Sequence, residues 1–197
     1  MIGFDLDMTL IDSRPGVGAA YEALSAETGT WIDVDLVVSR LGPPVEHELA
    51  HWFPAEDVPA LADRYRALYP AVAPQRVEVL PGAHEALAAA RSRGRVVVVT
   101  AKNRANAVLH VEHLGLQVDE VVGDVWRDGK ADVLRRGAAE VYVGDHVHDM
   151  EAAVSSGTTG VGVSTGPCSS SDLFGAGAHH VLASLVELPD WLRGRPT

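Results

Sequence analysis

The sequence predicts an α/β fold, in which a Rossmann-like parallel sheet has helices on both faces and carries an inserted all-α cap. From residue 80 onward, short apolar runs alternate with segments of helical periodicity, a pattern typical of right-handed crossovers and a parallel sheet. One run holds four consecutive valines at positions 96–99, as expected of a strand buried on both faces. Residues 14–79, by contrast, show helical patterns and no convincing strand.

The core elements follow in order along the chain. A first strand is expected at residues 2–4, a short apolar run that precedes two aspartates. Later strands are expected at 95–100, 120–123, 140–145 and 160–163, with a short edge strand at 180–182. The intervening helices are expected at 83–93, 103–114, 130–136 and 149–156. Three of these helices are expected to end at glycines, namely Gly94, Gly115 and Gly157. Glycine readily adopts the left-handed conformation found at helix ends.

The inserted segment is interpreted as about four helices. They are expected at 17–29, at 33–40 with Asp33 as N-cap, at 45–53, and at 56–69. Gly42-Pro43-Pro44 is a breaker, and Pro54 and Pro70 are expected to close the last two helices. Trp31 and Trp52 are expected in the cap core or beside a substrate pocket.

We therefore expect two domains, a core of residues 1–13 and 80–197 and a helical cap of residues 14–79. The insertion point places the cap above the C-terminal end of the first strand, where ligands bind in open α/β sheets.

Composition excludes several classes of partner. The formal net charge of -11 argues against binding to nucleic acid. The single cysteine, Cys168, rules out an internal disulfide and suits a reducing cytoplasm. No apolar run approaches the roughly 20 residues that span a bilayer, so no membrane partner is expected. The oligomeric state stays open between monomer and homodimer.

Polar residues follow three of the predicted strands. Asp5 and Asp7 follow the first, Thr100-Ala101-Lys102 the second, and Asp145 with Asp149 a third. Each alone is compatible with a helix cap or turn. Because the carboxyl ends of parallel strands meet at one edge of a sheet, their joint occurrence indicates a functional site there.

These motifs resemble those of the haloacid dehalogenase-like hydrolase superfamily, in the phosphoglycolate phosphatase-like subgroup with a helical cap. Asp5-Leu6-Asp7-Met8-Thr9-Leu10 matches the first motif of the family, Thr100 the second, Lys130 the third, and the segment from Gly144-Asp145 to Asp149 the fourth. Met8 stands where the family often has glycine, and Ala131 follows Lys130 where proline is usual.

The resemblance implies a role for each catalytic position. Asp5 would be the nucleophile that forms an aspartyl-phosphate, and Asp7 the general acid and then base. Asp7 would work best with a pKa raised towards neutrality. Thr9 would order the loop. Thr100 and the nearby amides would bind the phosphoryl oxygens, and Lys130 would neutralise charge in the transition state.

The resemblance also implies a Mg²⁺ cofactor. The ion would bind Asp5, the main-chain oxygen of Asp7, and Asp145, an all-oxygen set that suits a hard cation. Asp149 would bind it through water or else hold Lys130.

Other polar residues are assigned to the substrate or left with alternatives. Thr100, Ala101 and Lys102 are expected at the substrate phosphate, and Lys102 is the rival to Lys130 for the catalytic role. Arg40 is expected to reach a substrate carboxylate or second phosphate, with a surface charge near a helix C-terminus as the alternative. His146 and His148 are interpreted as loop residues at the site mouth, against the alternative of a transition-metal pair.

The implied function is a Mg²⁺-dependent phosphatase acting on a small phosphorylated metabolite through an aspartyl-phosphate. A phosphomutase of the same superfamily and a non-catalytic phosphate-ligand binding module are the alternatives. The substrate cannot be named from the sequence.

Overall fold

The computed structural model describes residues 1–195 and has a six-stranded parallel sheet at its centre. The strand order is β5-β4-β1-β6-β7-β8, and every neighbouring pair is parallel. The strands are β1 (Ile2–Phe4), β4 (Val96–Val99), β5 (Glu120–Val122), β6 (Val141–Gly144), β7 (Thr159–Val163) and β8 (His180–Leu182). This confirms the expected fold class, and all six strands lie within a residue or two of their expected positions.

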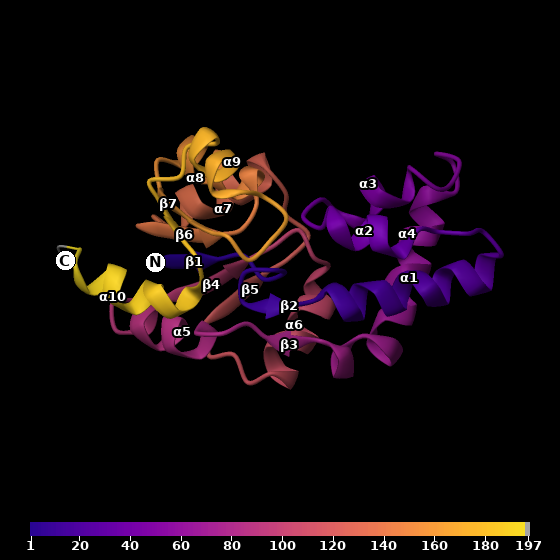
Figure 1. The fold of residues 1–197 in the computed structure, drawn as a ribbon, viewed down its shortest axis with the longest axis horizontal. Helices are drawn as coiled ribbons and strands as arrows, with labels where there is room; N and C mark the ends of the chain where they lie inside the picture. Colours follow the sequence, from indigo (N-terminus) through magenta and orange to yellow (C-terminus); the bar gives the residue numbers. More distant parts are fainter. Residues whose placement is uncertain (196–197) are drawn as a thin grey trace.

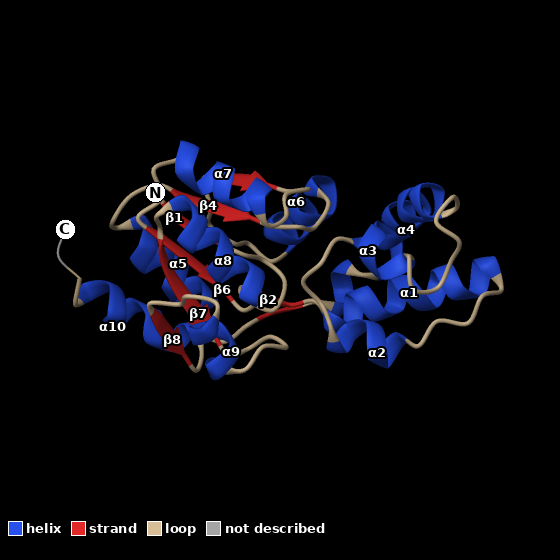
Figure 2. Cartoon of the chain, turned by 90° about the horizontal axis from the view of Figure 1, so that it is seen from above, coloured by secondary structure: helices blue, strands red, loops and turns tan. Residues whose placement is uncertain are grey.

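Helices cover both faces of this sheet (Figures 1 and 2). One face packs on α5 (Ala83–Arg91), α6 (Arg104–His113) and α10 (Leu188–Arg193), and its core includes Ile2, Phe4 and Val98. The other packs on α7 (Asp128–Arg136) and α8 (Val147–Ser156), next to α9 (Ser170–Gly175). Alternate strand residues serve the two faces because side chains two apart point the same way.

The second face needs a glycine in the central strand. A Cβ on Gly3 would lie 2.9 Å from the ring of Tyr142, so the missing side chain makes room for this buried tyrosine. The ring fills the space between β1 and α7, and its hydroxyl reaches the end of the sheet where the polar residues gather.

The inserted segment folds as a separate group of helices (right in Figure 1). It contains α1 (Arg14–Thr28), α2 (Val34–Ser39), α3 (Val45–Leu49) and α4 (Val58–Val72), which pack around their own apolar cluster. Helix α1 ends at Gly29 with a φ of 71°, and the Asp33 side chain accepts a hydrogen bond from Leu36 N at the start of α2. Both of these expected caps are confirmed.

A short antiparallel ribbon connects the two parts of the molecule. It pairs β2 (Ile11–Asp12) with β3 (Glu78–Val79), so the expectation of no strand within residues 14–79 is wrong at its end. Strands of two residues are too short to show an alternating pattern, which explains the omission. The ribbon lies at the expected boundaries of the cap, while the division into two domains stays a prediction, and residues 196–197 of the expected core lie outside the described residues.

Two further cap expectations are wrong. Pro70 lies inside α4 and does not close it, because the helix resumes at once with Ala73 N donating to Tyr69 O at 2.9 Å. The cost of the missing N–H is offset by the burial of Tyr69 and Ala73 in the cap cluster. Trp31 is 72% exposed and touches Trp52 edge-on, whereas Trp52 packs partly buried against the cap core.

Candidate active site

The polar strand ends meet where the sheet topology changes direction. The chain goes from β1 to β4 and β5 on one side, then returns to β6 on the other side of β1. Ligands bind at such a switch point because the loops leaving the carboxyl ends of adjacent strands part there. Asp5 follows β1, Thr100 follows β4 and Asp145 follows β6, so the structure brings these expected site residues together.

Lys130 lies between two carboxylates at the centre of the site. Its Nζ donates to Asp5 Oδ1 at 2.9 Å and to Asp149 Oδ1 at 2.7 Å, and the Lys130 residue is only 3% exposed. Burial alone would lower the pKa of this lysine, and the two carboxylates outweigh that effect and raise the pKa well above its usual value. Lys130 is therefore a permanent cation that touches the expected nucleophile.

Asp149 is fully engaged within the protein. Its Oδ1 accepts from Lys130 and, at 3.2 Å, from the Tyr142 hydroxyl, while its Oδ2 accepts from the backbone N–H of His146. Of the two roles open to Asp149 from the sequence, its hydrogen bonds favour holding Lys130.

Asp145 faces Asp5 across the site. Its Oδ1 accepts a 2.7 Å hydrogen bond from the Thr9 hydroxyl, which ties the loop after β1 to the end of β6. Burial and the nearby carboxylates of Asp5 and Asp149 raise the pKa of Asp145 well above its usual value. Burial, with Asp149 and Asp7 adding to it against Lys130, raises the pKa of Asp5 to about 7.

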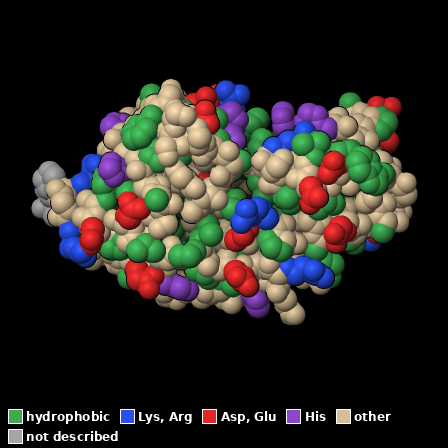
Figure 3. All heavy atoms as spheres, viewed as in Figure 1, with side chains coloured by type: hydrophobic (Ala, Val, Ile, Leu, Met, Phe, Trp, Pro, Cys, Tyr) green, Lys and Arg blue, Asp and Glu red, His purple; other side chains and the backbone are tan. Residues whose placement is uncertain are grey.

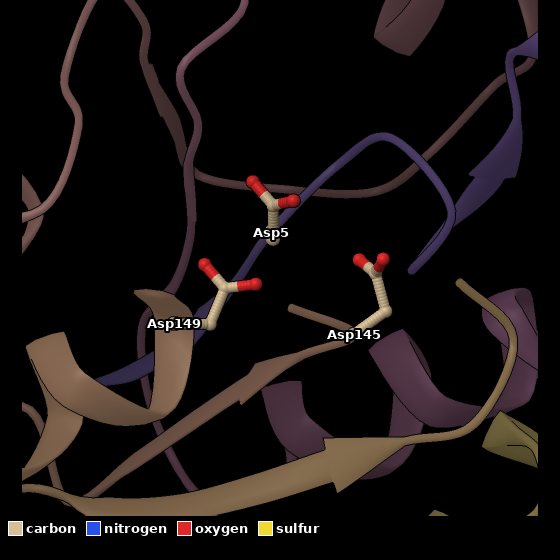
Figure 4. Close-up of side chains that lie close together, drawn as sticks. All are labelled: Asp5, Asp145 and Asp149. Carbon is tan, nitrogen blue, oxygen red and sulfur yellow. The ribbon is translucent and has the colours of Figure 1, made fainter. Parts of the chain in front are cut away.

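The carboxylates are suited to a divalent cation. One oxygen from each of Asp5, Asp145 and Asp149 lies within 4.8 Å of the other two, and Figure 4 shows these side chains converging from separate segments. With Asp7 included, the site contains four carboxylates but only two ammonium groups, those of Lys130 and Lys102. In the described chain, Asp5 Oδ2 and Asp145 Oδ2 accept no hydrogen bond. Carboxylate oxygens without a hydrogen-bond donor, such as Asp145 Oδ2, suit a hard cation such as Mg²⁺.

Asp7 is paired with Lys102. Lys102 Nζ donates to Asp7 Oδ1 at 2.9 Å and lies 4.6 Å from the ring centroid of Tyr69 in α4 of the cap. Burial raises the pKa of Asp7, but the charge of Lys102 acts together with hydrogen bonds to the carboxylate, and these effects lower the pKa overall. The pKa of Asp7 is thus shifted opposite to the direction expected of a general acid, because Lys102 contacts Asp7 directly.

The remaining predicted substrate residues line one cleft between the cap and the core. Thr100, Ala101 and Lys102 form part of its floor with Asp5 and Asp7, and Arg40 is part of the cap wall. Thr100 is buried, and its hydroxyl oxygen accepts from Lys102 N at 3.2 Å, which shapes the turn after β4. The structure thus places every predicted substrate residue on the surface of a single cleft.

A comparison with protein families identifies this arrangement. A family model described as haloacid dehalogenase-like hydrolase matches residues 2–153. The match covers well over half of the chain and includes every strand-end motif. The chain belongs to the haloacid dehalogenase-like hydrolase family. This confirms the expected family, a family of hydrolases.

Curated relatives of this hydrolase include two kinds of protein. The chain is 30% identical over 210 residues to the phosphoglycolate phosphatase of Caulobacter vibrioides, a match that covers 95% of this chain and 88% of that protein. It is also 30% identical over 181 residues to the tyrosine-protein kinase PtkA of Mycobacterium tuberculosis, covering 84% of this chain. The chain spans about 62% of the length of PtkA.

Solved structures share the haloacid dehalogenase-like fold along almost the whole chain. A crystal structure of a predicted phosphatase from Clostridium acetobutylicum matches with a TM-score of 0.83 and 25% identity, covering 98% of both chains. A haloacid dehalogenase-like hydrolase from Streptococcus pneumoniae matches with a TM-score of 0.84 and 22% identity, covering 96% of both. No helix among residues 1–195 is long and apolar enough to cross a membrane.

The two departures from the usual motifs of the haloacid dehalogenase-like hydrolases have structural explanations. Met8 has a φ of 58°, a left-handed conformation that glycine adopts more easily, and its side chain is buried away from the cleft. The apolar burial of Met8 offsets a backbone cost of about 1–2 kcal/mol. Ala131 uses its N–H to donate to Arg127 O, so alanine adds a helical hydrogen bond that proline would lack.

The two histidines of the fourth motif are placed by the start of α8. His146 is the N-cap, and its ring accepts a hydrogen bond from His148 N in a capping box with Asp149. His148 lies in the first turn of α8, so its expected place in a loop is wrong. Neither histidine belongs to the group of metal-ligating side chains found in the described part of the chain.

Several residues of the site were not anticipated. Tyr142 donates to both Val99 O and Asp149, and a tyrosine in an apolar strand is the one signal that could have suggested a buried hydroxyl with partners. Tyr69 reaches from the cap to His110, with 3.0 Å between its hydroxyl and His110 Nε2. No sequence pattern marks that contact.

Proposed function

We propose that this protein hydrolyses a small phosphate monoester through an aspartyl-phosphate at Asp5, with Mg²⁺ as cofactor. The observation that supports this most strongly is the buried set of Asp5, Lys130 and Asp145 at the switch point of the sheet. A carboxylate nucleophile, a fixed cation and oxygen ligands for a metal are the parts that phosphoryl transfer requires. The similarity to a phosphoglycolate phosphatase supports a small phosphorylated substrate.

In the first step, a carboxylate oxygen of Asp5 attacks phosphorus and the bond to the leaving oxygen breaks. Asp5 Oδ2 is the oxygen available for attack, because Oδ1 accepts from Lys130. The Lys130 ammonium stabilises the negative charge that develops on the phosphoryl group. Thr100 and the turn that follows it hold the phosphoryl oxygens at the floor of the cleft.

Asp7 moves the protons of both steps. Its carboxyl gives a proton to the leaving oxygen, and its carboxylate then takes a proton from the water that attacks the phosphoenzyme. The second step releases inorganic phosphate and restores Asp5. Contact with Lys102 favours the ionised form of Asp7, which suits the second step. For the first step, Lys102 must shift from Asp7 towards the incoming phosphate.

Mg²⁺ would be held by Asp5 and Asp145, with the main-chain oxygen of Asp7 as a further proposed ligand. When bound, the ion supplies positive charge that keeps both carboxylates ionised and neutralises the phosphoryl oxygens. Its two charges match the excess of carboxylates over ammonium groups in the site.

Hydrolysis of an aryl phosphate tests the proposed function. We expect p-nitrophenyl phosphate to be turned over with Mg²⁺ and turnover to cease with EDTA, returning when Mg²⁺ is added in excess. A folded protein that binds Mg²⁺ but releases no phosphate from this ester or from a panel of metabolite phosphates would contradict it. That result would favour the phosphomutase or the non-catalytic binding module.

Replacing Lys102 should change the pH dependence of the reaction. In Lys102→Met the pKa of Asp7 is expected to rise, because burial then acts without the opposing charge. Asp7 then stays protonated to higher pH. The alkaline limb of the pH profile of kcat/KM should therefore shift to higher pH by about one unit or more. Lys102→Arg keeps the charge and serves as the control. An unmoved limb in the methionine variant would show that Lys102 does not set the protonation of Asp7.

A further inference from the structure

The cleft above the reaction centre has a cap wall that can recognise the leaving group. It lies between α1, α2, α3 and α4 on the cap side and the strand ends and α6 of the core, and it is partly open to solvent. Figure 3 shows the hollow between the two parts of the molecule. Its lining combines apolar side chains with a few polar ones, as is usual for small-molecule sites. The inference below rests on the proposed phosphatase function.

Arg40, the expected contact for a substrate anion, is already bound to a carboxylate of the cap. Its Nε and Nη2 donate to the two oxygens of Glu48, at 2.8 and 2.6 Å. Trp52 Nε1 donates to the same carboxylate at 2.8 Å and holds it in place. Arg40 and Glu48 both line the cleft, so this part of the wall presents a neutral pair.

The other cations of the cleft are paired as well. Arg66 donates through Nη1 and Nη2 to Asp63 and Glu46. Lys102 is bound to Asp7. Among the lining residues that the structure describes, every lysine and arginine therefore has a carboxylate partner before substrate enters.

Uncharged polar groups on both sides of the same cleft have no partner among the described residues, Asn106 on α6 of the core and two tyrosines of the cap. Asn106 is 5% exposed and lines the cleft, and its side-chain carboxamide makes no hydrogen bond within residues 1–195. The hydroxyls of Tyr21 and Tyr65 also make none there, and their rings pack 4.7 Å apart in the wall. A carboxamide and two phenols offer both donors and acceptors to a ligand.

We propose that Glu48 determines the charge of the leaving group that this enzyme accepts. By neutralising Arg40, it makes the cleft selective for phosphate esters of uncharged, hydroxylated compounds over esters whose leaving group carries a carboxylate. Asn106, Tyr21 and Tyr65 are the partners for the hydroxyl groups of the substrate.

The physical reason is the cost of desolvation. A carboxylate that leaves water for this wall finds no unpaired cation, and it lies close to the carboxylate of Glu48. A hydroxyl loses less on leaving water and finds the free carboxamide and phenols. Removing the charge of Glu48 would free the Arg40 guanidinium for a charge-assisted bond to an incoming carboxylate.

Two esters of matched size test the proposal. 2-Hydroxyethyl phosphate and 2-phosphoglycolate each have a two-carbon leaving group, one ending in a hydroxyl and the other in a carboxylate. Each is used as a competitive inhibitor of p-nitrophenyl phosphate hydrolysis, and the ratio of the two inhibition constants is the readout. We expect the wild-type enzyme to bind the hydroxyl ester about tenfold more tightly or better.

Removing the charge of Glu48, the partner of Arg40, should reverse the preference for the hydroxyl ester. Glu48→Gln keeps the shape of the side chain and is expected to shift the ratio about tenfold to a hundredfold towards 2-phosphoglycolate. Adding Arg40→Gln to this variant should cancel the shift. Glu27→Gln is the matched control, because Glu27 pairs with Arg64 on the exposed surface of the cap and neither residue lines the cleft.

The outcomes separate this inference from the proposed function. Suppose that the wild-type enzyme hydrolyses p-nitrophenyl phosphate. If it then binds 2-phosphoglycolate more tightly than 2-hydroxyethyl phosphate, or if Glu48→Gln leaves the ratio of the two inhibition constants unchanged, the inference is overturned and the phosphatase function stays intact. Absence of any hydrolysis by the folded wild-type enzyme would overturn the proposed function, and the inference with it.

Discussion

Lys130→Met is expected to cost the protein both stability and activity. Lys130 is the buried cation between Asp5 and Asp149, so its loss leaves Asp5 without its hydrogen-bond donor and leaves both buried carboxylates without a cation. Breaking a buried ion pair by removing one member destabilises a protein by about 3–5 kcal/mol. Loss of the charge that stabilises the transition state should lower kcat by about 100- to 1000-fold or more.

Urea unfolding without Mg²⁺ measures the loss of stability, and aryl phosphate hydrolysis measures the loss of activity. Arg64→Met serves as the control for loss of a cation, since Arg64 forms an exposed ion pair with Glu27 and little change is expected from its loss. A Lys130→Met protein with the unfolding midpoint and kcat of wild type would show that Lys130 is neither the structural nor the catalytic cation.

Asp5→Asn is expected to abolish turnover while leaving the fold intact. The carboxamide has nearly the same shape as the carboxylate but is a poor nucleophile, so no phosphoenzyme can form and kcat should fall by about 10⁴-fold or more. Stability should be kept or increased, because burial and neighbouring carboxylates already raise the pKa of Asp5 to about 7 and so disfavour its charged form. The measurement pairs kcat with thermal unfolding.

Asp132→Asn is a matched control for Asp5→Asn. Asp132 lies exposed on α7, the helix that carries Lys130, and pairs with Arg135. Its replacement should leave kcat unchanged. If Asp5→Asn retained a substantial share of wild-type activity, Asp5 would not be the nucleophile.

The sequence was sufficient to predict the sheet and the positions of Asp5, Thr100, Lys130 and Asp145. Asp5, Thr100 and Asp145 each follow a strand of strongly apolar composition, and parallel topology alone brings such strand ends to one edge. Lys130 lies in helix α7, and only its motif indicated its place. Helix caps such as Asp33 and Gly29 were equally predictable, because their signal is local.

Pairings between distant segments could not be predicted. The bond from Lys102 to Asp7 and that from Arg40 to Glu48 depend on how side chains meet after packing. The position of Pro70 within α4 and the β2–β3 ribbon are also set by tertiary contacts, which outweigh local propensity. Only the structure therefore shows which lysine and arginine side chains of the cleft are paired with carboxylates.

Trapping the phosphoenzyme tests the central claim most directly. The reaction with p-nitrophenyl phosphate and Mg²⁺ is stopped with acid during turnover, and the protein is reduced with borohydride, digested and analysed by mass spectrometry. The proposed mechanism predicts reduction of a single aspartyl-phosphate to homoserine at Asp5, absent without substrate and absent in Asp5→Asn. Phosphate release in turnover with no modified Asp5, or with the modification at another residue, would contradict it.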